Sequence, residues 1–373
     1  MTRRQWLATG LAGIGAAVWG LSRTRGVRRA DFDSASELSD LASRTGKHLA
    51  SVLQDACLAP SGHNTQPWRV KLESETAFRL EVEPKRVPAL VDPDHREVVL
   101  SLGAFIENAA VSARAKGLEL AVVPQLRSLQ DESIAHISLL GRARSADATD
   151  PRIALRRTLR GRFSTRAIPG ASIDQLLRGA DAAGNSVVFF AADSAAGKSA
   201  TEMTIEANRA QAGRDAVQEE LADWLRWSDQ AAARHRDGLT TEALGVEGVA
   251  GWYVRNFFRH DSSLQPGNRA RASETAREQA HACGGWLVLC GGESAPDMLE
   301  LGRIYERIAL GARAASLGLH PMSQALEELP WRSQVSTTLG LPRPARMLLR
   351  VGLVDTYPNP VSLRRPVANV VSA

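Results

Sequence analysis

The sequence predicts an α+β fold in which two tandem halves share one chain of 373 residues. Three observations support this prediction. Short apolar runs alternate with longer helix-like runs, one helix-like run is repeated later in the chain, and a polar loop with two prolines joins an early helix to a strand. Such alternation favours helices packed on a mixed sheet. We expect the halves at residues 45–150 and 151–373.

The strand candidates are short apolar or alternating runs bounded by turn-forming residues. They cover residues 69–72, 78–83, 135–140, 187–192, 286–290 and 347–351. A helix is expected at residues 47–58, directly before the polar loop, because Pro60 and Gly62 stop helical structure there.

The repeated run predicts a pair of buried helices. Residues 100–115 align with residues 299–314, and eight of the sixteen positions are identical, including Glu107 with Glu306. Small residues at helical spacing allow close packing, and repeated units usually need each other to bury their apolar faces. The two halves should therefore form, within one chain, an interface like that of a dimer.

A weaker similarity pairs residues 53–59 with residues 177–183. The distance along the chain between these two segments is smaller than the distance between the two copies of the repeated run. This difference implies an insertion at about residues 200–280. We expect one long amphipathic helix from Met203 to Arg236. An aromatic stretch follows it and could cover a site as a lid. Its aromatic residues are Trp252, Tyr253, Phe257 and Phe258.

Composition excludes several classes of protein. The formal charge of +5 and the pI near 9.4 are modest, and no nucleic-acid-binding motif is present, so we expect no nucleic-acid partner. The three cysteines, Cys57, Cys283 and Cys290, do not form a disulfide framework, and no set of residues has the spacing of a metal site.

The N-terminus carries an export pattern. Arg3 and Arg4 precede a run without charged residues that ends at Arg23. Residues 1–30 therefore predict a twin-arginine signal, which could stay on as a membrane anchor, and hence a periplasmic or envelope location. This route carries folded proteins and suits a protein that acquires its cofactor in the cytoplasm.

The most informative segment is the loop Ala59-Pro-Ser-Gly-His-Asn-Thr-Gln-Pro-Trp68. On composition alone it is an ordinary helix-to-strand connection. Its pattern resembles the flavin loop of the nitroreductase-like FMN-binding oxidoreductases. That resemblance implies a nitroreductase-like fold and FMN as cofactor, with Pro60, Ser61, Gly62, Asn64 and Gln66 at the flavin.

A second segment fits the FMN phosphate. Arg162, Ser164 and Arg166 alternate, so an extended backbone would place them on one side. Guanidinium groups bind phosphate through paired hydrogen bonds, and a hydroxyl can complete the shell. A solvated basic segment is the other interpretation. The second half has this segment and lacks the loop, and the first half has the reverse, so we expect a single composite site.

The resemblance extends to the C-terminal region. Residues 320–324 resemble the family segment that meets the flavin ring, which implies contacts from Met322 and Ser323. Arg364 and Arg365 resemble the basic pair that reaches the phosphate. The fused halves with one site look most like the Acg-type proteins of this family.

The resemblance implies an FMN-dependent oxidoreductase. Hydride would pass from NAD(P)H through FMN to a nitroaromatic or quinone-like acceptor in a ping-pong cycle. A non-enzymatic protein that stores or sequesters FMN is the alternative. We name no catalytic side chain, although His63 is the nearest titratable candidate. Because the dimer-like interface is internal, a monomer is expected.

Overall fold

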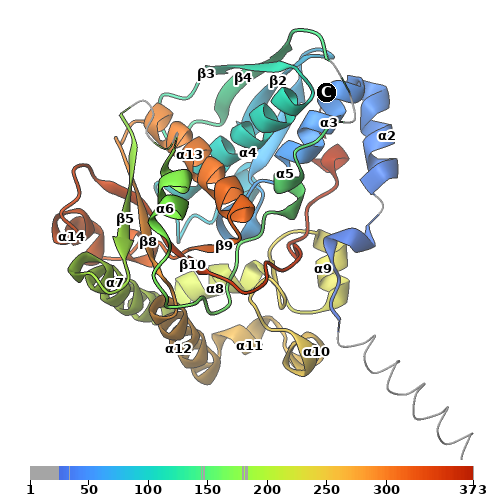
Figure 1. Cartoon of the computed structure of the whole chain (residues 1–373). Helices are drawn as coiled ribbons and strands as arrows, with labels where there is room; N and C mark the ends of the chain where they lie inside the picture. The colour runs from blue at the N-terminus through green and yellow to red at the C-terminus, as the bar shows by residue number, and fades with distance from the viewer. Residues whose placement is uncertain are drawn as a thin grey trace, which may run out of the picture.

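The computed structural model describes residues 25–32, 34–143, 145, 148–178, 180 and 184–372, and it confirms the α+β class. Two main sheets and the helices packed on them make up the molecule (Figure 1). Arg3 and Arg4 of the predicted export signal lie outside the described residues.

The first half builds a five-stranded sheet in the order β11-β1-β2-β4-β3. Its strands are β1 (Trp68–Leu72), β2 (Ala77–Val82), β3 (Glu119–Pro124), β4 (Ser133–Leu140) and β11 (Val371–Ser372). Neighbours are antiparallel except β11, which comes from the end of the chain and runs parallel to β1 with Val70 opposite Val371. The C-terminus therefore completes the sheet of the first half.

The second half builds an antiparallel sheet in the order β5-β8-β10-β9. Its strands are β5 (Ser186–Ala191), β8 (Gly285–Cys290), β9 (Leu317–Pro321) and β10 (Ala345–Leu353). All six residues of β8 are buried, which explains its unbroken apolar sequence. The predicted strands in both halves are confirmed to within one or two residues at most ends.

Helices α4 (Arg96–Ala115) and α13 (Ala295–Ala314), which contain the repeated run, pack together in the middle of the molecule (Figure 1). A Cβ at Gly103 would overlap the carbonyl oxygen of Leu299, and a Cβ at Gly302 would overlap that of Leu100. These contacts are reciprocal, because Leu100 and Gly103 align with Leu299 and Gly302 in the repeat. Helix α4 is long and apolar enough to cross a membrane, but most of it is buried inside the protein.

The largest apolar core cluster contains residues from both halves. It contains residues from α3 (Lys47–Ala56), α4, α13 and both main sheets. The remaining helices outside the insertion are α2 (Ser34–Thr45), α5 (Pro151–Leu155), α6 (Gly170–Leu177) and α14 (Trp331–Thr338), with short 3-10 turns η1 (Arg29–Asp31), η2 (Gly62–Asn64), η3 (Pro84–Arg86), η4 (Gln324–Leu326) and η5 (Val367–Asn369).

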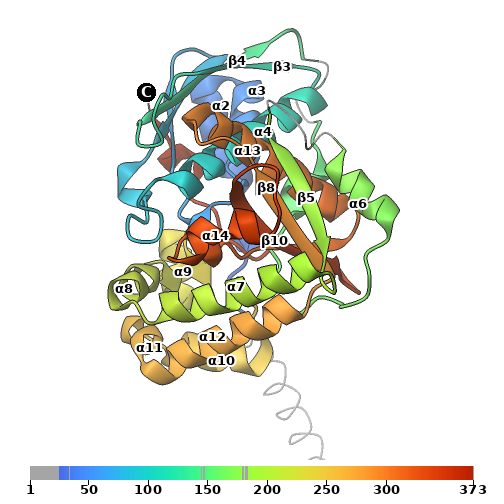
Figure 2. The same ribbon diagram turned by 90° about the vertical axis from the view of Figure 1, so that its left-hand side faces the viewer.

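The segment predicted as an insertion forms a group of helices along one side of the molecule, at the bottom of Figure 2. Its elements are α7 (Ala195–Ala212), α8 (Asp215–Asp223), β6 (Leu225–Arg226), α9 (Asp229–His235), β7 (Leu239–Thr240), α10 (Gly248–Phe257), α11 (His260–Leu264) and α12 (Pro266–His281). The predicted single helix from Met203 to Arg236 is wrong. It is interrupted at Gly213 and again at β6, where the backbone pairs with β7.

Candidate functional site

The loop after α3 has an unusual backbone. His63, Asn64 and Gln66 all adopt positive φ angles of 47°, 56° and 54°. Such conformations cost non-glycine residues free energy and persist only where surrounding contacts fix them. Ser61 supplies one contact from within the loop, because its Oγ accepts a hydrogen bond of 2.9 Å from the Gln66 N–H.

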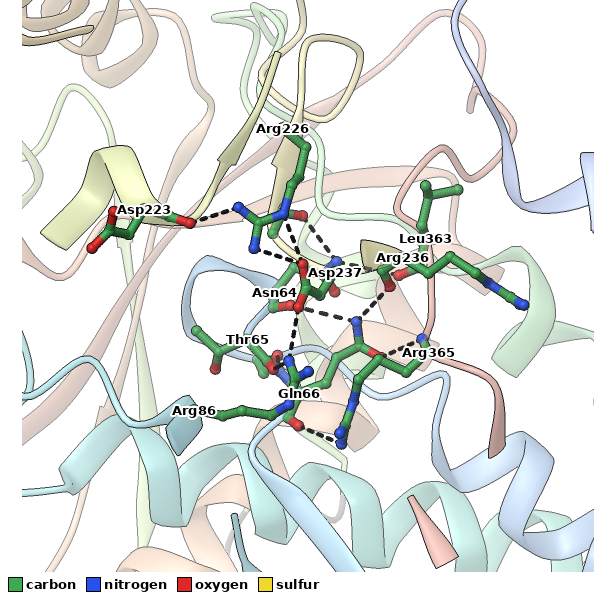
Figure 3. Close-up of polar contacts among 12 residues, drawn as sticks. Asn64, Thr65, Gln66, Arg86, Asp223, Arg226, Arg236, Asp237, Leu363 and Arg365 are labelled. Atoms are coloured by element: carbon green, nitrogen blue, oxygen red, sulfur yellow. Dashed lines mark hydrogen bonds and ion pairs between the residues drawn. The ribbon is translucent and has the colours of Figure 1, made fainter. Parts of the chain in front are cut away.

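Other segments fix the loop from outside (Figure 3). Asn64 donates to the carbonyl oxygens of Gly238 (3.0 Å) and Leu363 (3.2 Å), and its Oδ1 accepts from Arg364 (2.8 Å). Gln66 donates to the Arg236 carbonyl oxygen (3.0 Å), and its Oε1 accepts from the Arg365 N–H (2.9 Å). The amides of Asn64 and Gln66 therefore join the loop to the insertion and to the C-terminal segment.

The other face of the loop borders a cavity of about 280 Å³, which we call the main cavity. Pro60, Ser61, Gly62 and His63 line it from the loop, and His320, Pro321, Ser323 and Gln324 line it from the end of β9 and η4. The insertion also lines this cavity, through α7, α8, β6, β7 and α12, with polar residues Asn208, Gln211, Gln218 and Ser273.

A second cavity of about 30 Å³ adjoins the main cavity and is rich in arginine. The two cavities share Pro60, Ser61, Thr158, Arg160 and Leu239 in their linings. Five arginines line this arginine-rich cavity: Arg29, Arg156, Arg157, Arg160 and Arg364.

The guanidinium groups of this cavity are held close together away from water. Burial, and then repulsion from Arg156, lowers the pKa of Arg29 to about 10. Burial likewise lowers the pKa of Arg160 to about 10, and that of Arg364 falls well below its usual value through burial and the positive charges of Arg29 and Arg156. Buried Nε atoms of Arg157 and Arg364 have no hydrogen-bond partner among the described residues. This cavity is therefore an environment that favours an anion.

One acidic group stabilises part of this charge. Glu306 on α13 is fully buried, and its Oε1 lies 3.1 Å from Arg156 Nε. Burial raises the pKa of Glu306 to about 7, although Arg156 and Arg364 oppose that shift.

The main cavity carries acidic groups as well. Glu97 of α4 and Glu327 after η4 both line it, and Glu327 accepts a hydrogen bond of 2.7 Å from Gln211. Burial, followed by the nearby Glu97 carboxylate, raises the pKa of Glu327. His63 lies in the same lining, and burial lowers its pKa.

The structure brings six of the predicted site residues to these two cavities. Pro60, Ser61, Gly62 and Ser323 line the main cavity, while Asn64 and Arg364 line the arginine-rich cavity together with Pro60 and Ser61. Three others are buried but line neither cavity: Gln66, Met322 and Arg365. Arg365 instead donates to the carbonyl oxygens of Gln66 and Trp68.

The predicted phosphate wall of Arg162, Ser164 and Arg166 lies elsewhere. These residues line neither cavity, and the Arg162 side chain is 75% exposed and 3.8 Å from the carboxylate of Glu278. Ser164 accepts hydrogen bonds from Arg166, so the two side chains contact each other at the surface. Solvent, which was the other interpretation of this segment, surrounds the two arginines.

The residues that sequence reasoning missed lie a few positions earlier in the same segment. Arg156-Arg157-Thr158-Leu159-Arg160 supplies three of the five arginines and a hydroxyl. The spacing of its arginines and hydroxyl is as suitable for a phosphate as the spacing in residues 162–166. Arg29 was missed because the sequence offered no sign that the segment after the export pattern folds against this site.

The aromatic lid was also misplaced. Trp252, Tyr253, Phe257 and Phe258 line neither cavity. Helix α10 buries Gly251 and Arg255, and Arg255 pairs with Glu242, so the aromatic face points outward with Tyr253 53% and Phe257 56% exposed. Among the described residues no cluster of three metal-binding side chains is present.

The chain is similar in sequence to known proteins along most of its length. No protein-family profile matches the chain. The chain is 29% identical over 339 residues to "Putative NAD(P)H nitroreductase Rv3131" of Mycobacterium tuberculosis, covering 87% of this chain and 90% of that protein. It is 26% identical over 349 residues to "Putative NAD(P)H nitroreductase acg" of the same species, covering 86% and 94%.

Two solved nitroreductase structures show partial similarity to the chain, with low TM-scores. The FMN-dependent nitroreductase NfnB from Mycobacterium smegmatis, in complex with NADPH, matches with a TM-score of 0.32 and 16% identity over 55% of this chain and 86% of that one. A nitroreductase with bound FMN from Desulfitobacterium hafniense matches with a TM-score of 0.33 and 14% identity over 56% and 90%. The chain is therefore similar in sequence, along most of its length, to proteins named "Putative NAD(P)H nitroreductase".

Proposed function

We propose that this protein is an FMN-dependent oxidoreductase of nitroreductase type. The observation that carries the proposal is the pair of adjoining cavities, one of mixed polarity and one rich in arginine, which share Ser61 and Arg160. A ligand with a flat ring at one end and a phosphate at the other suits this pair. FMN has that form.

The residues of the arginine-rich cavity fit a phosphate. Guanidinium groups donate paired hydrogen bonds to phosphate oxygens, and such charge-assisted bonds are stronger than neutral ones. A bound dianion would relieve the mutual repulsion of the buried arginines and provide acceptors for the unpartnered Nε atoms of Arg157 and Arg364. We assign phosphate binding to Arg156, Arg157 and Arg160, with Arg29 and Arg364 beside them.

The main cavity suits the ring. Pro60, Ser61 and Gly62 would hold it from the loop, and Ser323 from the segment after β9. Bound FMN would supply the redox chemistry, while the chain orients it and limits access of water. The electron donor would be NAD(P)H, and the acceptor a nitroaromatic or quinone-like molecule.

The duplication and the export signal remain part of the proposal. The reciprocal contacts of Gly103 and Gly302 support an Acg-type fusion in which the two halves form an internal dimer and the protein is a monomer. The twin-arginine pattern at Arg3 and Arg4 supports export to the periplasm or envelope, with the N-terminal segment as a signal or anchor.

One observation favours the alternative function, storage or sequestration of FMN. The insertion lines the main cavity together with the loop, through α7, α8 and α12 among other elements. A ring held between the loop and the insertion would be shielded from a second substrate.

Anaerobic mixing of the purified, FMN-loaded protein with NADPH tests the proposal. We expect the flavin absorbance to bleach and to return when a nitroaromatic is added. Stable FMN binding without bleaching would favour storage. A protein that retains no FMN after reconstitution would contradict both functions.

A further inference from the structure

The main cavity contains a histidine whose proton position is set by a buried arginine. Arg350 on β10 is fully buried and lies opposite His320 of β9 in the sheet register. Its Nε donates a hydrogen bond of 3.0 Å to His320 Nδ1.

Arg350 is itself fixed on all sides. Its Nη1 donates to the carbonyl oxygens of Gln279 (2.9 Å) and Ala282 (3.3 Å), and its Nη2 donates to those of Gly161 (2.7 Å) and Leu159 (3.4 Å). The guanidinium carbon also lies 4.1 Å from the centre of the Phe163 ring. The group therefore has little freedom to turn away from His320.

This contact determines the tautomer of His320. Arginine Nε–H can only donate, so Nδ1 of His320 must be the unprotonated, accepting nitrogen. Burial and the positive charge of Arg350 lower the pKa of His320 well below its usual value, which keeps the imidazole neutral. The remaining hydrogen then lies on Nε2.

His320 Nε2 has no hydrogen-bond partner among the described residues, although the side chain is only 7% exposed and lines the main cavity. A donor that lines a cavity and has no partner in the protein is available to a ligand placed there.

We propose that His320 is a neutral hydrogen-bond donor to the flavin ring in the main cavity, and that Arg350 is the residue that positions it. The inference rests on the proposed function, because it takes the ring of FMN as the occupant. The carbonyl and imine atoms at the ring edge are uncharged acceptors, and an N–H donor from a neutral imidazole matches them.

Nitrogen-15 NMR of histidine-labelled full-length protein at pH 7 tests the inference, with FMN as the probe. His320 is assigned by the loss of its signals in His320→Gln. We expect an unprotonated Nδ1 and a protonated Nε2 before FMN is added, and a change at Nε2–H on saturation. His48, exposed on α3, serves as the control and should not change.

Affinity measurements complete the test. His320→Phe should weaken FMN binding by about 2- to 12-fold, the effect of one net hydrogen bond. His320→Gln should bind nearly as wild type, because a glutamine amide can accept from Arg350 and still donate. A protonated Nδ1, an unchanged Nε2 signal in FMN-saturated protein, or wild-type affinity in His320→Phe would overturn the inference. Absence of any FMN binding by the wild type would instead overturn the proposed function.

Discussion

Two arginine-rich stretches of the same segment have opposite environments. Arg156, Arg157, Thr158 and Arg160 line the cavities, with Arg156 only 4% exposed, whereas residues 162–166 place Arg162 and Arg166 in solvent. Backbone hydrogen bonds explain the difference in environment between the two stretches. The Leu159 N–H donates to the carbonyl oxygen of Leu319 in β9, and the N–H groups of Phe163 and Ser164 donate to carbonyl oxygens that flank or end other strands.

This difference shows that arginine spacing alone does not reveal which arginines are buried around a cavity. Both stretches carry guanidinium groups near a hydroxyl, but only the first has its charges held together where water cannot screen them. The two stretches differ in the burial of their guanidinium groups, and this burial depends on the strands against which each stretch lies. The following predictions test this contrast, from the largest expected effect to the smallest.

The first prediction concerns the acidic partners of the two stretches. Glu306, the partner of Arg156, has a folded-state pKa of about 7 against an ordinary value of 4.5. Between these pH values the folded protein binds more protons than the unfolded one, so the free energy of unfolding should fall as pH rises. This group contributes a decline of about 3 kcal/mol at roughly 1.4 kcal/mol per pKa unit.

Urea denaturation at several pH values between 4.5 and 7 measures this effect. Glu306→Gln should reduce the decline of the free energy of unfolding with pH. Glu278→Gln, which alters the exposed partner of Arg162, should leave it as in the wild type. Equal changes in the pH dependence of the two variants would contradict the proposed difference between residues 156–160 and residues 162–166.

The second prediction concerns FMN affinity. Arg160→Ala should weaken FMN binding by about 1.5–3 kcal/mol, the range for a hydrogen bond to a charged group. Arg162→Ala and Arg166→Ala should change it less than twofold, because these side chains lie outside the cavities. Titration followed by flavin fluorescence measures all three, and a larger loss in Arg162→Ala than in Arg160→Ala would restore the prediction from sequence.

The third prediction concerns folding stability without cofactor. Arg156→Ala removes the partner of Glu306 and a hydrogen bond of 3.0 Å to the Leu58 carbonyl oxygen. We expect a loss of about 1–3 kcal/mol, the usual cost of leaving buried polar groups unpaired. Arg162→Ala is the matched control and should cost less than about 0.5 kcal/mol, since exposed ion pairs contribute little. Chemical denaturation of the apoproteins at pH 7 gives both values.

Much of the fold could be predicted from the sequence. The buried strands β8 and β10 carry unmistakable apolar runs, and the repeat at α4 and α13 predicted two helices that indeed pack together. Strands β3 and β9 were missed. The first is mostly exposed, and the second contains Gly318, His320 and Pro321, so neither has the usual strand composition.

The site was predicted less completely. Residues 60–63 of the predicted loop, and Ser323, line the main cavity. Arg162 and Arg166, which were predicted at the phosphate, line neither cavity, whereas Arg156, Arg157 and Arg160 line the arginine-rich cavity, because sequence does not show which of several arginines is buried. The insertion was expected to cover the site with the aromatic residues of α10. It lines the main cavity through α7, α8 and α12 instead.

The pairing of β11 with β1 has a consequence for how the protein is made. The first half of the chain finishes its sheet with Val371 and fixes its loop with Arg364, so both features await residues that are synthesised some 300 positions later. Assembly of the arginine-rich cavity must therefore wait until Arg364 has been synthesised, and a truncation that removes Arg364 acts on a region that the ribosome completed some 300 residues earlier.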